Sequence, residues 1–173
     1  MKKNIVLIGF MGTGKSAVGR RLAKELNYHF VDIDQDIELL VGMKIKDIFR
    51  LYGEKRFRSE EELMIQKLSS TINTVISAGG GVVLNNKNVI SLRNHAVLIE
   101  LQADPDVILE RVKKNNNRPL VQGASLEDIE ASYAMRRPLY AVADFHIDTS
   151  HQSIDDTVEE IVLMLKSRKE MDE

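Results

Sequence analysis

The sequence predicts an α/β domain in which a five-stranded parallel sheet carries helices on both faces. Short apolar runs alternate with longer segments of helical periodicity along the 173 residues. The apolar runs are continuous, as in strands covered on both sides, and several end in glycine or aspartate. Strand–helix alternation of this kind favours parallel strands joined by crossover helices. The length suits a single domain with one sizeable core, so we expect residues 1–173 to form one unit.

Periodicity places the individual elements. We expect strands at residues 5–8, 30–34, 75–78, 96–101 and 145–148. We expect helices at residues 15–27, 45–52, 55–68, 105–114, 125–140 and 154–166. The first helix is indicated by Val18, Leu22 and Leu26, which recur on one face. Gly53 separates the second and third helices, because glycine interrupts helical segments.

Capping residues support the later helices. Pro105 opens a helix with Asp104 as its N-cap, since proline is favoured in the first helical turn. Ser125 caps the next helix, and Asp128 three residues later resembles a capping box. Between them, residues 115–123 are polar and include three consecutive asparagines, which predicts a mobile loop.

Composition narrows the functional class. The net charge is −2, without the basic bias of duplex-DNA binders, so we expect no nucleic-acid partner. No run approaches the ~20 apolar residues of a membrane helix, and we expect no membrane partner. The chain has no cysteine, which excludes disulfides and thiolate metal sites and fits a reducing compartment. We expect a cytoplasmic monomer.

A phosphate-binding loop is the strongest signal. Residues 9–16 read GFMGTGKS and match the P-loop pattern G-x-x-x-x-G-K-[ST], with an apolar strand before it and a helix after it. Its glycines let backbone amides face phosphate oxygens, and the helix N-terminus adds positive potential. Lys15 is expected as a surface cation for the phosphates, and the Ser16 hydroxyl as a Mg²⁺ ligand. The predicted ATP contacts in this segment are Gly12, Thr13, Gly14, Lys15, Ser16 and Ala17.

A P-loop identifies nucleotide binding but leaves a kinase, a GTPase switch and a binding module open. Asp32 and Asp34 end the second expected strand, where the ligand crevice of a parallel sheet lies. On an extended chain both carboxylates would share one side, one for Mg²⁺ and one for an acceptor hydroxyl. The alternative is that these aspartates cap a helix.

Two further clusters suit an anionic acceptor. Arg58 and Glu61 are three residues apart on a helix, so Glu61 can hold the guanidinium towards a ligand carboxylate. A solvated salt-bridge face is the alternative. Residues 79–81 are three glycines at a strand end, which suits a ligand touching the backbone. A mobile hinge is the alternative there.

Arginines occur in the polar loop and after it. Arg118 lies between flexible residues and can close over the phosphates, as lids do in phosphoryl transfer. The alternative is that Arg118 lies in a solvent-exposed loop and has no functional role. Arg136 and Arg137 end the next helix, where they can bind a ligand or balance the helix dipole.

Taken together, these motifs resemble the shikimate kinase family. The resemblance covers nearly the whole chain and implies a P-loop kinase fold with a lid at about residues 112–124 and an acceptor-binding region at about residues 34–62. It implies transfer of the γ-phosphate of ATP to shikimate, with Mg²⁺ as cofactor. The roles it implies are Asp34 as base on the acceptor hydroxyl, Arg58 and Arg136 as carboxylate clamp, Gly80 and Gly81 as acceptor-site backbone, Lys15 and Arg118 at the transferring phosphate, Ser16 and Asp32 at Mg²⁺, and Arg111 beside the adenine.

Rival functions remain within and beyond this class. Gluconate and nucleoside monophosphate kinases share the phosphate loop and the lid. The two-arginine clamp and the triple glycine argue against a nucleotide acceptor. A GTPase would carry an N-K-x-D guanine signature, and the sequence contains no such tetrapeptide. The segment after the last strand begins with Asp148 and Thr149, which match the start of the family's adenine loop, whereas the family often has proline where Ile154 stands.

Overall fold

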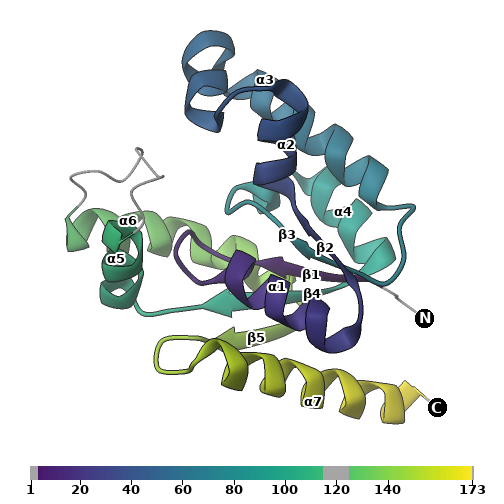
Figure 1. Ribbon diagram of the computed structural model, residues 1–173. Coiled ribbons are helices and arrows are strands. Elements are labelled where there is room, and N and C mark those ends of the chain that lie inside the picture. Colours follow the sequence, from purple (N-terminus) through teal and green to yellow (C-terminus); the bar gives the residue numbers. More distant parts are fainter. Residues whose placement is uncertain (1–3, 115–124, 173) are drawn as a thin grey trace.

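In the computed structural model, residues 4–114 and 125–172 are described, and they form a sheet between two layers of helices (Figure 1). The strands are β1 Asn4–Ile8, β2 His29–Asp32, β3 Thr74–Ser77, β4 Ala96–Gln102 and β5 Phe145–Asp148. All neighbouring strands are parallel, in the order β2-β3-β1-β4-β5. The predicted α/β class with five parallel strands is therefore confirmed.

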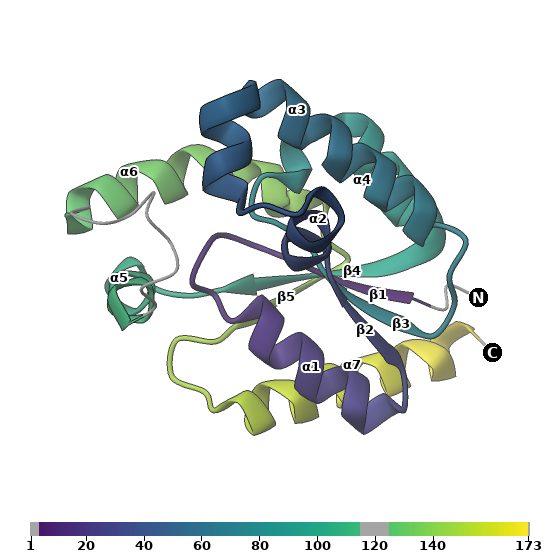
Figure 2. The ribbon, with the colours of Figure 1, turned by 45° about the horizontal axis from the view of Figure 1, so that its top comes forward.

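Helices cover both faces of this sheet. They are α1 Lys15–Leu26, α2 Ile33–Val41, α3 Ile45–Leu68, α4 Asn86–His95, α5 Pro105–Lys114, α6 Leu126–Arg136 and α7 Ile154–Asp172, with the 3₁₀ helices η1 Val82–Leu84 and η3 Arg137–Val142. Figure 2 shows α1 and α7 side by side beneath the sheet, and α3, α4 and α6 above it. None of the helices in residues 4–114 and 125–172 has the length and apolar character that a membrane span requires.

The central strands are buried on both faces, which explains their continuous apolar runs. On β1, Leu7 belongs to the cluster that includes Val18 of α1 and Ile161 of α7. Its neighbour Val6 belongs to the opposite cluster, which includes Ile65 of α3. Because successive side chains point to opposite faces, a strand covered twice needs apolar residues at every position.

Several elements differ from the sequence expectation. The second strand ends at Asp32, and Asp34 lies in the first turn of α2. The expectation that Asp32 and Asp34 lie on one side of an extended chain is therefore wrong. Asp32 instead caps the N-terminus of α2. The sequence also predicted neither α2 nor α4, of which α4 is mostly polar. Only Val89 and Leu92 are its buried apolar residues, so its periodicity is weak.

Two predicted helix signals agree with the structure, and one predicted boundary does not. Gly53 has a non-helical backbone (φ 78°, ψ 169°) and breaks α3 into the two predicted parts. Ser125 and Asp128 form the predicted capping box of α6. The helix expected at residues 125–140 instead ends at Arg136 and continues as η3. Pro138 lacks the N–H that an α-helix requires. Most of the predicted lid, residues 115–124, lies outside the described residues.

Candidate active site

The P-loop follows the carboxyl end of β1 and leads into α1. Gly9, Gly12 and Gly14 have φ values of 137°, 77° and 95°, which side chains other than glycine rarely adopt. These conformations turn the chain tightly before α1 begins at Lys15. The turn and the helix N-terminus together form a site suited to phosphate.

Lys15 is held inside the loop. Its Nζ donates hydrogen bonds to the carbonyl oxygens of Gly9 at 2.8 Å and Phe10 at 2.7 Å. The residue is only 7% exposed, so the expectation of a surface cation is wrong. Its ammonium group lies at the loop that would receive the phosphates, surrounded by backbone carbonyls.

Ser16 and Asp32 meet between α1 and the end of β2. The Ser16 hydroxyl donates to Asp32 Oδ2 at 2.5 Å, and Asp32 Oδ1 accepts from the Gln35 N–H at 3.3 Å, as the N-cap of α2. Ser77, at the end of β3, lies 3.4 Å from the Ser16 hydroxyl. A hydroxyl and a carboxylate are the hard oxygen donors that Mg²⁺ takes alongside phosphate oxygens. No cluster of three carboxylate or imidazole groups suited to a metal occurs among the described residues.

Asp34 packs against the glycine loop, which we define as residues 79–81. A Cβ atom added at Gly79 would lie 2.6 Å from Asp34 Oδ1. A side chain at this position would therefore displace the carboxylate. The close approach, rather than an unusual backbone angle, explains why glycine stands here.

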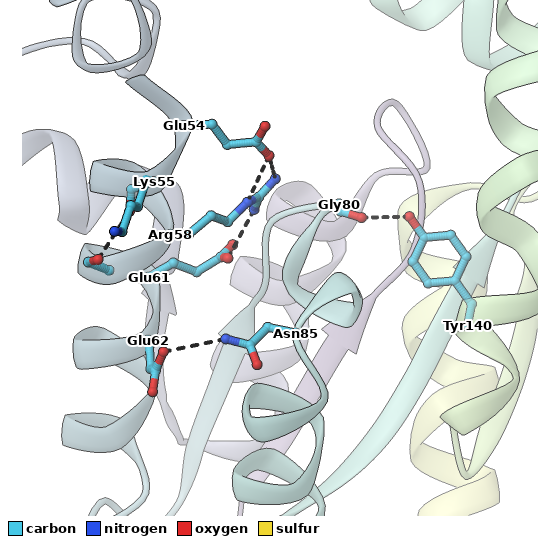
Figure 3. Close-up of polar contacts among 9 residues, drawn as sticks. Glu54, Lys55, Arg58, Glu61, Glu62, Gly80, Asn85 and Tyr140 are labelled. Atoms are coloured by element: carbon cyan, nitrogen blue, oxygen red, sulfur yellow. Dashed lines mark hydrogen bonds and ion pairs between the residues drawn. The ribbon is translucent and has the colours of Figure 1, made fainter. Parts of the chain in front are cut away.

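Arg58 is fixed by two carboxylates of its own helix (Figure 3). Its Nη1 donates to Glu61 Oε2 at 3.0 Å, while Nε and Nη2 donate to Glu54 Oε1 at 3.2 and 3.1 Å. The Glu61 side chain is fully buried. Burial raises the pKa of the Glu61 carboxyl, and the Arg58 charge opposes that rise. A solvated salt-bridge face does not fit a buried carboxylate.

The glycine loop lies close to both the P-loop and the Arg58 cluster, which we define as Arg58, Glu54 and Glu61. A Cβ added at Gly81 would lie 2.5 Å from Arg58 Nη2, and one at Gly80 would lie 3.5 Å from the Gly9 carbonyl oxygen. None of the three glycines has a positive φ, so a hinge role has no support from their backbone angles. The Tyr140 hydroxyl donates to the Gly80 carbonyl at 2.7 Å.

Arg111 and Arg136 both lie close to the P-loop. The Arg111 guanidinium donates to the Thr149 hydroxyl at 3.0 Å and carbonyl at 2.6 Å. The same hydroxyl lies 3.0 Å from the Thr13 carbonyl, so Arg111 is tied to the P-loop and the segment after β5. Arg136 lies over the Phe10 ring, 5.9 Å from its centroid. Arg118 lies outside the described residues.

Sequence reasoning assigned no role to four residues of this region. Glu54 holds Arg58, Ser77 approaches Ser16, and Thr149 and Tyr140 join distant segments. Glu54 could have been found, because it lies four residues before Arg58 on one helix face. The other contacts cross between segments, and local spacing carries no signal for them.

Comparison with known sequences agrees with this geometry. The family model described as shikimate kinase matches residues 11–166. A shikimate kinase of Pelotomaculum thermopropionicum is 52% identical over 165 residues, which cover 95% of this chain and 96% of that protein.

Comparison with solved structures also finds a shikimate kinase. A shikimate kinase from Acinetobacter baumannii in complex with shikimate superimposes with a TM-score of 0.91 at 33% identity, covering 96% of this chain and 94% of that one. A gluconokinase from Sinorhizobium meliloti 1021 superimposes with a TM-score of 0.59 at 20% identity, covering 92% and 89%. That second likeness shows the fold alone.

Proposed function

Because this chain belongs to the shikimate kinase family, we propose that it transfers the γ-phosphate of ATP to a hydroxyl of shikimate, giving shikimate 3-phosphate and ADP. One observation carries the proposal for the site. The P-loop, Asp34 and the Arg58 cluster all adjoin the glycine loop at the carboxyl ends of neighbouring strands. A phosphate donor and an acidic acceptor would therefore meet at the same place.

The nucleotide would occupy the P-loop. Backbone amides from Gly12 to Ala17 and the Lys15 ammonium would bind the phosphates, with Arg111 beside the adenine. Ser16 and Asp32 would hold Mg²⁺, which supplies charge neutralisation at the phosphate oxygens when bound. The 2.5 Å hydrogen bond between the Ser16 hydroxyl and the Asp32 carboxylate supports this role.

The acceptor would lie between α3, the glycine loop and the end of α6. Arg58 and Arg136 would bind its carboxylate, because a guanidinium matches a carboxylate in shape and charge. Asp34 would accept a hydrogen bond from the reacting hydroxyl, and the backbone of Gly80 and Gly81 would line the pocket. Glu61 would keep the Arg58 guanidinium aimed at the acceptor.

In the transfer step, the acceptor oxygen attacks the γ-phosphorus while Asp34 takes the hydroxyl proton. The bond from the γ-phosphorus to the β-bridging oxygen breaks, and ADP leaves in line with the attacking oxygen. Lys15 stabilises the charge on the phosphoryl oxygens. The lid at residues 112–124 and the contribution of Arg118 remain predictions, as do a single domain, a monomer and a cytoplasmic location.

A panel of acceptors tests this function against its rivals. The purified chain is incubated with ATP and Mg²⁺ and with shikimate, gluconate or nucleoside monophosphates, and ADP release is measured with product identification by ³¹P NMR. We expect shikimate to be phosphorylated with a kcat/KM at least about 100-fold above that of any other acceptor, since a site built around specific polar partners discriminates strongly. A preference for gluconate or for a nucleotide would overturn the proposal.

A further inference from the structure

The glycine loop is held through its backbone: the Gly79 carbonyl accepts from the Val82 N–H and the Gly81 carbonyl from the Leu84 N–H, both at 3.0 Å. Residues 79–81 carry no side chains, and Gly79 and Gly81 each leave room for a neighbouring side chain. Gly79 adjoins Asp34, and Gly81 adjoins the Arg58 guanidinium. A displacement of this loop would therefore change the space beside both acceptor-site groups.

Tyr140 reaches this loop from the other side of the site. It lies in η3, directly after the end of α6, and is fully buried. Its hydroxyl donates to the Gly80 carbonyl at 2.7 Å, across 60 residues of sequence (Figure 3). The rest of its side chain packs in the core cluster that contains Phe10 and Ile129, so the ring aims the hydroxyl without conformational freedom.

Burial also sets the protonation state of this hydroxyl. Burial raises the pKa of Tyr140 to about 12, and the charge and a hydrogen bond of Arg136 oppose that rise. The phenol therefore keeps its proton at neutral pH and stays a hydrogen-bond donor. Its hydrogen bond to the Gly80 carbonyl therefore holds a backbone group of the proposed acceptor site.

We infer that Tyr140 is a positioning residue for the acceptor, holding the Gly80 backbone in place beside the proposed acceptor site. This inference rests on the proposed function. Tyr140 itself need not touch the acceptor, because it holds a backbone group that would line the acceptor site. Its hydroxyl should consequently affect acceptor binding and leave nucleotide binding unchanged.

The test is Tyr140→Phe, which removes one oxygen and keeps the ring. Dissociation constants for shikimate and for ATP are measured by calorimetric titration, at a temperature where circular dichroism shows the variant folded. We expect the shikimate constant to rise about 3- to 30-fold, the range for losing a buried hydrogen bond, and the ATP constant to stay within twofold. Tyr133→Phe is the matched control: its ring packs on Phe10 at 5.3 Å, and we expect both constants to stay within twofold.

A second measurement does not depend on the acceptor. Amide hydrogen exchange is followed at residues 78–82, where the Val82 N–H is bonded to the Gly79 carbonyl. We expect faster exchange in Tyr140→Phe than in the wild type or in Tyr133→Phe. Unchanged exchange, or equal losses of shikimate and ATP affinity, would overturn the positioning role. Failure of the wild type to bind shikimate would instead count against the proposed function, and the exchange result would still stand.

Discussion

The Glu61 carboxylate is fully buried against the Arg58 guanidinium, with Oε2 accepting from Nη1 at 3.0 Å. The two residues are three apart on α3, so they share one face of the helix. A buried carboxylate is costly without a partner, and Arg58 supplies one. The pair orients the guanidinium towards the glycine loop, where the acceptor is proposed to bind.

The burial of Glu61 against Arg58 should make the free energy of unfolding depend on pH. Burial raises the pKa of Glu61 above its ordinary value of 4.5, so the folded state holds this proton more tightly than the unfolded state. The resulting stability is fully present below pH 4.5 and is lost as the pH rises through the folded pKa. We therefore expect the free energy of unfolding of the wild type, minus that of Glu61→Gln, to fall between pH 4 and pH 8. Urea titrations at each pH measure it, and a difference that rises with pH would contradict the assignment.

Replacing Lys15 should abolish most transfer. Lys15→Met removes the cation at the phosphate loop, and we expect kcat to fall at least about 100-fold, as when a charge-stabilising donor is lost. The Gly9 and Phe10 carbonyls also lose their donor, so thermal stability should drop somewhat. Lys24→Met, on the exposed face of the same helix, is the control and should retain normal turnover. Near-normal turnover in Lys15→Met would refute the P-loop assignment.

Asp34 should control the chemical step. Asp34→Asn keeps the shape beside Gly79 but removes the charge that attracts the hydroxyl proton. We expect kcat to fall by about 100-fold or more, within the range for general acid–base groups, with little change in ATP affinity. Asp36→Asn changes a neighbouring carboxyl in the same first turn and should leave kcat within about threefold. Unimpaired kcat in Asp34→Asn at saturating acceptor would place the base elsewhere.

The prediction for Arg118 comes from sequence alone. A lid arginine would stabilise charge that develops during transfer, so Arg118→Ala should lower kcat steeply with a small change in the ATP dissociation constant. Closure should also slow amide exchange across residues 115–123 when ATP and acceptor are both bound. Normal kcat together with fast exchange in the ternary complex would leave no role for a lid.

The contiguous parts of the site were predictable from the sequence, and the contacts between distant segments were not. The P-loop and the Arg58–Glu61 pair depend on local spacing, which fixes their geometry once the helix is recognised. Asp34 was placed on a strand because the apolar residues before it concealed the start of α2 at Ile33. The contact from Tyr140 to the glycine loop depends on how η3 packs beside η1, which no local pattern encodes.

The same limit applies to the nucleotide side. Arg111 was expected beside the adenine, but its anchor on Thr149 links residues 38 positions apart. Weak helical periodicity likewise concealed α4, whose sequence is mostly polar. Local sequence patterns indicated the phosphate-binding loop and the candidate acceptor-binding residues. The contacts that position these residues depend on how the helices pack on the sheet.

The central claim is that Arg58 and Arg136 bind the carboxylate of the acceptor. Both replacements, Arg58→Ala and Arg136→Ala, should weaken acceptor binding far more than ATP binding, because losing one partner of a buried charge pair costs ~2–5 kcal/mol. Arg56→Ala is the control, since Arg56 pairs with Glu60 and its side chain is 57% exposed.

The most direct measurement compares the binding of shikimate with that of its neutral carboxamide. Calorimetric titration of the wild type should give a much larger dissociation constant for the amide, at least about 30-fold, from the lost charge-assisted hydrogen bonds. The amide should lose little further affinity in Arg58→Ala or in Arg136→Ala. Equal binding of acid and amide to the wild type would contradict the carboxylate clamp, and with it the proposed placement of the acceptor.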